Sequence, residues 1–147
     1  MNLPTPSQAQ RLIETHLLNP NEFWAEHGVR TLSKNDFLYN PQDGYWQGPV
    51  WVVSNYLVMH GLLNYGYKVQ AQTLASETVN LLVDDINSTG GMNECYNPDT
   101  GAPTAGGDFV SWDLLGEHMR EEAQNGADPT AVDSTSTVNF LYTYPSL

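Results

Sequence analysis

Apolar residues recur three and four positions apart in three stretches of the chain, a spacing that predicts amphipathic helices. The first begins at a capping-box pattern on Ser7 and ends before an Asn-Pro pair. The second is predicted to begin at Pro49 and to end near Gly66. The third covers residues 68–86 and has the strongest helical pattern of the chain. The positions predicted to face the core are Ala9, Leu12, Ile13, His16, Leu17, Val52, Tyr56, Met59, Leu63, Leu74, Ala75, Val79, Leu82, Val83 and Ile86.

The segments between and after these helices are rich in turn-forming residues. Residues 21–45 predict a long, partly ordered loop with one short helix at most. A fourth helix is predicted from near Ser111. The helical pattern stops at Asn125, and the alternation that follows indicates one short strand without a partner. We therefore expect an all-α protein of about four helices with long loops. The inward positions of the fourth helix are Leu114, Leu115, His118 and Met119, and the alternating positions are Val138, Phe140, Tyr142 and Tyr144.

Length and composition indicate one packed domain. With 147 residues, 40% of them hydrophobic and 11% aromatic, the chain has enough apolar material for a core. A formal net charge of −12 argues against nucleic acid and an anionic membrane surface as partners, because few Lys or Arg side chains can displace phosphate counterions. Neutral ligands rich in hydroxyl groups, such as sugars, and basic proteins remain compatible with this charge.

Metal and redox chemistry find little support in the sequence. The single cysteine, Cys95, provides neither an internal disulfide nor a thiolate-rich metal site. His60 and His118 have no neighbouring His or Cys at ligand spacing, so we expect no metal and no cofactor. No apolar run approaches the ~20 residues of a membrane span. The first ten residues lack the features of a secretory signal, which favours a cytoplasmic location.

Aromatic residues gather in the segment 45–51 (YWQGPVW), where a loop is predicted to meet a helix. Tyr45, Trp46 and Trp51 together offer a flat apolar surface with N–H and O–H groups at its edges. Such surfaces stack on sugar rings while their polar edges bind hydroxyl groups. An equally good interpretation of the composition is that both tryptophans fill the core.

Glu94 lies in a turn-rich stretch between apolar and aromatic residues, a setting that desolvates a carboxylate. A carboxylate there could act as a general base. Taken alone, the better interpretation is a solvated loop residue. Asn93 and Asn97 are expected to shape the turn around it.

Together, the two segments resemble a known family. Residues 45–51, 61–67 (GLLNYGY) and 94–101 (ECYNPDTG), followed by an FVSW stretch at 109–112, are similar to the C-terminal portion of inverting α-glycosidases built on an (α/α)6 toroid. The most similar group is glycoside hydrolase family 63, which includes processing α-glucosidase I and bacterial mannosylglycerate hydrolases, with the trehalases as more distant relatives. The resemblance spans residues 8–122 and implies an incomplete toroid.

The resemblance also implies roles for particular residues. Glu94 corresponds to the general base that activates water in the family. An inverting enzyme places a second carboxyl, the general acid, about 6.5–9.5 Å from the base. The residues expected to line the sugar pocket are Tyr45, Trp46, Gln47, Gly48, Trp51, Tyr96 and Trp112.

Three departures from the family pattern change this expectation. Gln47 replaces the usual arginine and removes a fixed charge. Val110 is inserted before Ser111, which predicts a rotated or bulged start of the last helix. The aspartate that serves as general acid lies upstream in the family, and the 44 residues before Tyr45 do not reproduce its segment. Asp43 and Asp113 are the available substitutes, and we expect both to be structural or solvated.

The leading hypothesis is an α-glucosidase-like, inverting glycoside hydrolase fragment. Residues 1–122 would carry the general-base half of the active site, and residues 123–147 would form an irregular C-terminal tail. Its substrate would be an α-linked oligosaccharide or glycoside, hydrolysed when another chain or a longer product supplies the N-terminal half of the toroid with its acid. The alternatives are a non-catalytic carbohydrate-binding or accessory protein and an inactive truncated relative.

Overall fold

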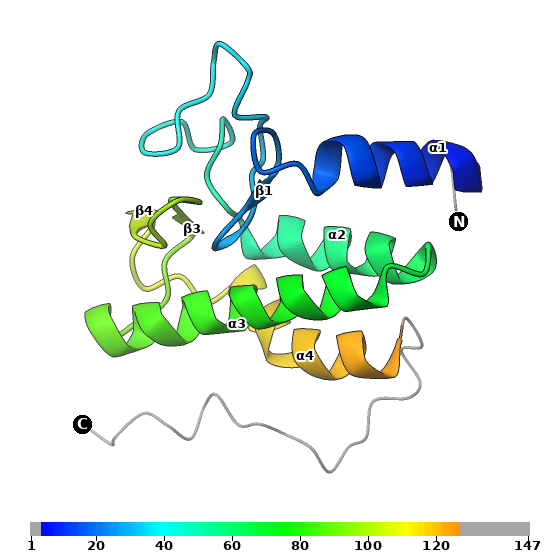
Figure 1. The fold of residues 1–147 in the computed structure, drawn as a ribbon. Helices are drawn as coiled ribbons and strands as arrows, with labels where there is room; N and C mark the ends of the chain where they lie inside the picture. The colour runs from blue at the N-terminus through cyan, green and yellow to red at the C-terminus, as the bar shows by residue number, and fades with distance from the viewer. Residues whose placement is uncertain (1–3, 127–147) are drawn as a thin grey trace.

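Two long helices, α2 (Val52–Asn64) and α3 (Lys68–Thr89), pack side by side at the centre of the fold (Figure 1). The structure is a computed structural model that describes residues 4–126. A third helix, α4 (Gly116–Asn125), packs against both. Their contact faces bury most of the core, whose largest members are Trp51, Tyr96, Met59, Leu62, Leu74, Leu82 and Met119. The prediction of a helix-rich fold is confirmed.

The ends of the central helices follow the predicted glycines. After α2, Gly66 has a φ of +84°, and α3 ends at Gly90 in the left-handed conformation. The start of α2 differs from the prediction, since it lies at Val52 rather than at Pro49. The reason is that Val50 is extended, with bridges to both Arg30 and Tyr96.

The N-terminal helix consists of α1 (Pro6–Arg11) and a π-helical continuation, η1 (Leu12–Leu17). Its capping box is formed by Thr5 and Gln8, not by the predicted pattern that starts at Ser7. A π-helical turn contains more residues than an α-helical turn, so it changes the face that follows it. As a result Leu12 and His16 are exposed, whereas Ile13 is buried.

The last helix begins with a 3-10 segment, η2 (Trp112–Leu115), and continues as α4. Because a 3-10 turn has only three residues, it rotates the positions that follow relative to an ideal α-helix. Leu114 and His118 are therefore exposed, contrary to the prediction, while Met119 is buried as expected. The helix ends at Asn125, where the helical pattern of the sequence stops. The predicted strand of residues 138–144 lies outside the described residues.

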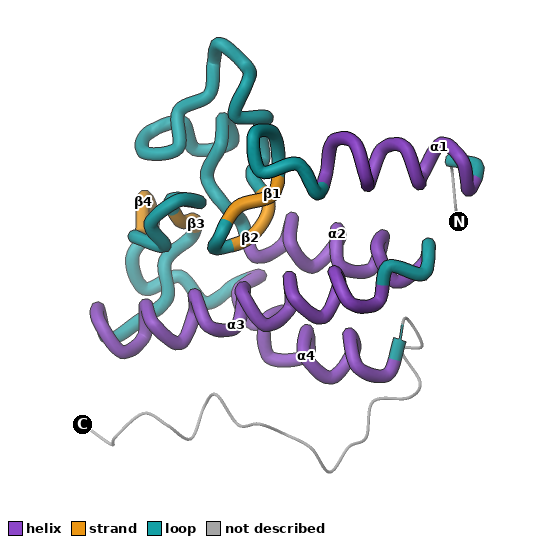
Figure 2. The backbone as a smooth tube through the Cα atoms, viewed as in Figure 1, coloured by secondary structure: helices purple, strands orange, loops and turns teal. Residues whose placement is uncertain are grey.

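Besides the helices, the structure contains two small antiparallel ladders (Figure 2). The all-α prediction does not include these strands. The predicted loop 21–45 contains no helix, and instead β1 (Trp24–Ala25) pairs with β2 (Gly28–Val29). Further along, β3 (Cys95–Tyr96) pairs with β4 (Pro103–Ala105). The β1–β2 ladder lies beside the start of α2, and the β3–β4 ladder lies on the same side of the helices, towards the end of α3. None of the helices in residues 4–126 is long and apolar enough to cross a membrane.

Candidate active site

Backbone pairing brings the two segments singled out in the sequence together. The N–H of Val50 donates to the carbonyl of Tyr96 at 2.8 Å, and the N–H of Tyr96 donates back at 3.0 Å. This bridge places the aromatic segment 45–51 beside the turn that carries Glu94. The Tyr45 hydroxyl then donates a hydrogen bond of 2.7 Å to Glu94 Oε1. Because ionisation of Tyr45 would place two anions together, this bond raises the pKa of Tyr45 above its ordinary value.

Four aromatic rings pack together beside this hydrogen bond, from the surface into the core. Trp46 stacks on Trp51 with ring centroids 3.8 Å apart and 12° between the planes. Tyr45 meets Trp51 edge-on at 4.7 Å, and Trp112 packs against it at 5.7 Å. Trp51 is 0% exposed, whereas Trp46 is 47% and Tyr45 is 45% exposed. The two sequence interpretations therefore apply to different residues, because Trp51 fills the core and Trp46 presents an indole to the surface.

Tyr45 adopts an uncommon backbone conformation, with a φ of +57°. Left-handed conformations of non-glycine residues are strained, and they cluster at functional sites. The surroundings hold Tyr45 there from both ends. Trp51 Nε1 donates to the Tyr45 carbonyl at 2.8 Å, while the Tyr45 hydroxyl is bound to Glu94.

Gln47 and Gly48 complete the segment. The Gln47 side chain is exposed, and the backbone carbonyl of Gln47 accepts a hydrogen bond of 2.7 Å from the Asn40 N–H. Gly48 is buried with a φ of +137°, and a Cβ at this position would lie 2.7 Å from the Tyr39 ring. Gly48 thus fits the backbone of the segment and offers no side chain to a ligand.

The backbone of Glu94 is fixed by the neighbouring strand. Its N–H lies within hydrogen-bonding distance of two carbonyls, those of Ala105 at 2.9 Å and Gly106 at 3.0 Å. Gly106 has a φ of +67°, and a Cβ there would lie 2.6 Å from Glu94 Cβ. Only glycine therefore fits this position without displacing Glu94. On the other side, Asn97 Oδ1 accepts from the N–H groups of Asp99 and Thr100, which shapes the turn as predicted.

Like Trp51, two further predicted site residues lie away from the exposed aromatic surface. Tyr96 is fully buried, and its hydroxyl donates to Asp85 at 2.8 Å. It belongs to the core because β3 pairs with both Val50 and β4. Trp112 is partly buried behind Trp51, and its Nε1 is buried without a partner among the described residues.

Of the two substitute acids, which we expected to be structural or solvated, Asp43 is exposed and Asp113 is buried. Asp113 is 1% exposed, and neither of its carboxyl oxygens has a hydrogen-bond partner in the described part of the chain. Burial, together with the nearby charges of Asp85 and Glu94, raises its pKa to about 8. Asp113 is therefore neutral at pH 7, and it has no exposed surface with which to contact a sugar.

Arg30 and Asp85, which were not among the predicted site residues, organise the site. The Arg30 guanidinium is buried, binds Asp99 Oδ1 at 2.7 Å, and also donates to Tyr39 and to loop carbonyls. It thereby ties the loop before the aromatic segment to the turn after Glu94. No local pattern distinguishes such an arginine from a solvated one. For Asp85 a signal exists, since it lies three residues after Leu82 on the apolar face of α3.

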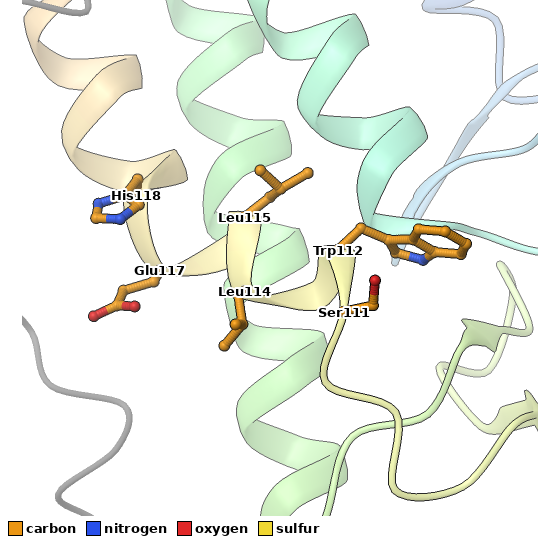
Figure 3. A pocket seen from close by; sticks show the side chains of 6 residues that line it. All are labelled: Ser111, Trp112, Leu114, Leu115, Glu117 and His118. Atoms are coloured by element: carbon orange, nitrogen blue, oxygen red, sulfur yellow. The ribbon is translucent and has the colours of Figure 1, made fainter.

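Two cavities adjoin the aromatic residues. One, of about 500 Å³, lies at the junction of η2 and α4 (Figure 3). The other, of about 520 Å³, is lined by Trp46 together with residues of η1, α2 and the β1–β2 region. Glu94 lines neither of these two cavities. Within residues 4–126, no three His, Cys, Asp or Glu side chains are grouped so that they could hold a metal ion. The lining residues of the first cavity are Ser111, Trp112, Leu114, Leu115, Glu117 and His118.

Comparison with known proteins gives consistent matches. A family model described as the mannosylglycerate hydrolase MGH1-like glycoside hydrolase domain matches residues 1–112. A probable mannosyl-oligosaccharide glucosidase of Schizosaccharomyces pombe is 28% identical over 130 residues, which cover 82% of this chain and 16% of that protein. The mannosylglycerate hydrolase MGH1 of Selaginella moellendorffii is 41% identical over 68 residues, 46% of this chain and 13% of that protein.

A solved structure is also similar. The GH63 mannosylglycerate hydrolase from Thermus thermophilus, in complex with Tris and D-glycerate, has a TM-score of 0.61 and 27% sequence identity. The match covers 75% of this chain and 25% of that chain. This chain thus spans 16% or less of the two curated relatives and a quarter of the solved protein.

Proposed function

Since the chain belongs to the family of the mannosylglycerate hydrolase MGH1-like glycoside hydrolase domain, we propose that it carries the general-base half of an inverting α-glycosidase site, with Glu94 as the base. The observation that carries this proposal is the placement of the Glu94 carboxylate. Oε1 is bound by Tyr45, next to the exposed indole of Trp46. A sugar ring stacked on Trp46 would lie within reach of a water held by Glu94.

In this reaction Glu94 accepts a proton from water while the water oxygen attacks the anomeric carbon. The bond from that carbon to the leaving oxygen breaks on the opposite face, and an acid protonates the departing oxygen. A carboxylate has about four lone-pair sites, so the single bond from Tyr45 leaves capacity for the water. The Tyr45 bond also fixes the orientation of the carboxylate, which favours a productive approach.

The proposed substrate is an α-linked glycoside. The relatives described above are named as hydrolases of mannosylglycerate or as a glucosidase of mannosyl-oligosaccharides. A neutral glycoside is compatible with the net charge of −12, whereas mannosylglycerate carries a carboxylate, so we propose the neutral class. Gln47 is exposed beside Trp46, where it could bind hydroxyl groups without adding charge.

The general acid comes from outside this chain in our proposal. Asp113, although protonated at neutral pH, is too deeply buried to reach a leaving group. The four helical segments are proposed to form part of an (α/α)6 toroid that a longer product or a second polypeptide completes. Without an acid, rates should fall by about 10²–10⁴ for leaving groups that need protonation.

The decisive experiment uses α-glucosyl fluoride, because fluoride departs without protonation and does not need the missing acid. Fluoride release is measured for the chain alone and together with a polypeptide that supplies the upstream helices. Glu94→Gln should reduce the rate of fluoride release by a factor of about 10²–10⁴. Glu26→Gln, the same change at an exposed hairpin position, should leave it unaltered. Sugar binding with no turnover in either condition would refute the proposal and favour a non-catalytic carbohydrate-binding protein.

A further inference from the structure

We propose that Asp85, on α3, is a positioning residue for Glu94: its buried carboxylate holds the residues on both sides of the general base. The inference rests on the proposed function for its catalytic meaning, although the positioning itself can be measured without turnover. Asp85 is 3% exposed and contacts no exposed part of the site, so it acts through its neighbours.

The Asp85 carboxylate is the centre of a dense hydrogen-bond network. Asn93 Nδ2 donates to Oδ1 at 3.0 Å and to Oδ2 at 2.8 Å. The Tyr96 hydroxyl donates to Oδ2 at 2.8 Å, and Thr89 Oγ1 donates to Oδ1 at 3.0 Å. Both carboxylate oxygens are therefore satisfied, which offsets much of the cost of burying this group.

Two residues of this network flank Glu94 in the sequence. Asn93 immediately precedes it and Tyr96 follows two positions later, and the two are joined because the Asn93 N–H donates to the Tyr96 hydroxyl at 2.9 Å. Glu94 itself is held by β4 through its own N–H. The backbone of the general base is thus fixed from α3 on one side and from β4 on the other, and its carboxylate is directed to Tyr45.

Burying a carboxylate costs desolvation free energy, which is offset only when its oxygens accept hydrogen bonds from neighbouring donors. Replacement by asparagine keeps the shape but turns one acceptor oxygen into an NH₂ donor. Because Asn93 Nδ2 donates to both oxygens of Asp85, the new NH₂ group would face the Asn93 amide in either orientation of the side chain. We therefore expect Asp85→Asn to release the Glu94 segment without opening a cavity.

The test compares Asp85→Asn with Asp84→Asn, which removes an adjacent, exposed charge on the same helix. The first readout is the pKa of Tyr45, followed by NMR with tyrosine labelled at Cζ, because the Glu94 hydrogen bond is the largest cause of its rise. Asp85→Asn and Glu94→Gln should each lower this pKa, and Asp84→Asn should leave it unchanged. In the Glu94→Gln background, Asp85→Asn should have no further effect.

The second readout is the hydrolysis of α-glucosyl fluoride. A displaced base lowers kcat by about 10- to 100-fold, while KM stays within about twofold because the aromatic surface is retained. In the Glu94→Gln background the added substitution should cost nothing more, whereas a merely structural defect would reduce activity in both backgrounds. If Asp85→Asn fails to fold, Tyr96→Phe provides the same test, since it removes a single hydroxyl of the network.

The outcomes separate the two proposals. A Tyr45 pKa that stays raised in folded Asp85→Asn or Tyr96→Phe overturns the positioning role. A Tyr45 pKa that falls as expected, in a protein without Glu94-dependent turnover, supports the positioning role and refutes the proposed function. Loss of turnover with an unchanged Tyr45 pKa assigns the loss to another cause and also overturns the inference.

Discussion

Three carboxyl groups near the aromatic segment each lie in a different environment. Asp85 is buried but receives hydrogen bonds from three side chains. Glu94 is partly exposed and is bound by one tyrosine hydroxyl. Asp113 is buried with no partner among the described residues, and the charges of the other two raise its pKa further. Their hydrogen bonds thus differ in kind: Asp85 accepts from several donors, Glu94 is the candidate base and Asp113 is a neutral acid.

Asp113 should make the stability of the protein depend on pH. Its pKa is 3.8 in its ordinary state and about 8 in the fold, so between these values the folded state holds a proton that the unfolded state releases. The contribution of Asp113 to the free energy of unfolding is therefore greatest at low pH. It falls as pH rises through the window, by at most about 1.4 kcal/mol per pH unit. Asp113→Asn should remove this contribution and make the variant more stable than wild type in alkali.

Urea unfolding of both proteins between about pH 4 and about pH 9 measures the difference. Glu77, whose pKa burial raises to about 7, contributes to both proteins in the same direction and cancels in the comparison. Asp84→Asn is the control, since this residue is exposed on α3. Parallel pH profiles for wild type and Asp113→Asn would contradict the prediction.

Among the secondary-structure elements, one buried amide connects the β1–β2 hairpin to both central helices. Asn55, on α2, accepts a hydrogen bond of 3.0 Å from the Val29 N–H. Its Nδ2 donates to Thr78 Oγ1 at 2.9 Å, and Thr78 donates to the Leu74 carbonyl within α3. Because all of these groups are buried, losing any of them leaves an unsatisfied partner.

Gly28 next to this connection should be intolerant of any side chain. Its φ is +130°, and a Cβ would lie 2.3 Å from Asn55 Nδ2. We expect Gly28→Ala to lower the free energy of unfolding by about 2–4 kcal/mol, through backbone strain and displacement of Asn55. Chemical denaturation followed by circular dichroism provides the measurement.

Gly61 is the matched control, because it lies inside α2 and a Cβ there meets nothing within 4 Å. Gly61→Ala should stabilise the protein by about 1 kcal/mol, as alanine replaces glycine in a helix interior. Equal effects of the two substitutions would show that the hairpin is not fixed by this contact.

At the scale of the whole molecule, large apolar side chains remain uncovered on several elements. Leu12 lies on η1, Leu57 on α2, Val69 on α3 and Leu114 on η2, and all are exposed. Phe37 is 93% exposed in the loop before the aromatic segment. Exposed apolar surface of this kind favours association, whereas a net charge of −12 opposes it.

This balance predicts association that depends on salt. Repulsion between copies is strong at ~0.01 M ionic strength and screened at ~1 M, so the chain alone should be monomeric at low salt and self-associate at high salt. Sedimentation velocity in both conditions tests this. A polypeptide that supplies the upstream helices should suppress the association by covering the apolar surface. A monomer at every salt concentration would contradict the expectation.

The positions predicted correctly from the sequence and those predicted wrongly differ for physical reasons. The predicted stripe on α3 is buried at Leu74, Ala75, Val79 and Leu82, because helical periodicity is a local property, but Val83 is 38% exposed, contrary to the prediction. Leu12 and Leu114 were placed wrongly inside, since they lie in a π-helical and a 3-10 segment, whose turns differ from the 3.6-residue turn that the prediction assumed. Of the predicted pocket residues, Tyr96 and Trp51 proved to be core residues, because burial depends on which segments pack over them.

The amino-acid sequence by itself determined the family, through motifs that the family model confirms over residues 1–112, and most of the helices, through local spacing. Only the tertiary structure decided that Tyr45 binds Glu94, a residue 49 positions away, and that Asp85 holds the residues around it. It also left Asp113 without a partner among the described residues. The physical reason is that hydrogen-bond partners are allotted by long-range packing, which periodicity and composition do not encode.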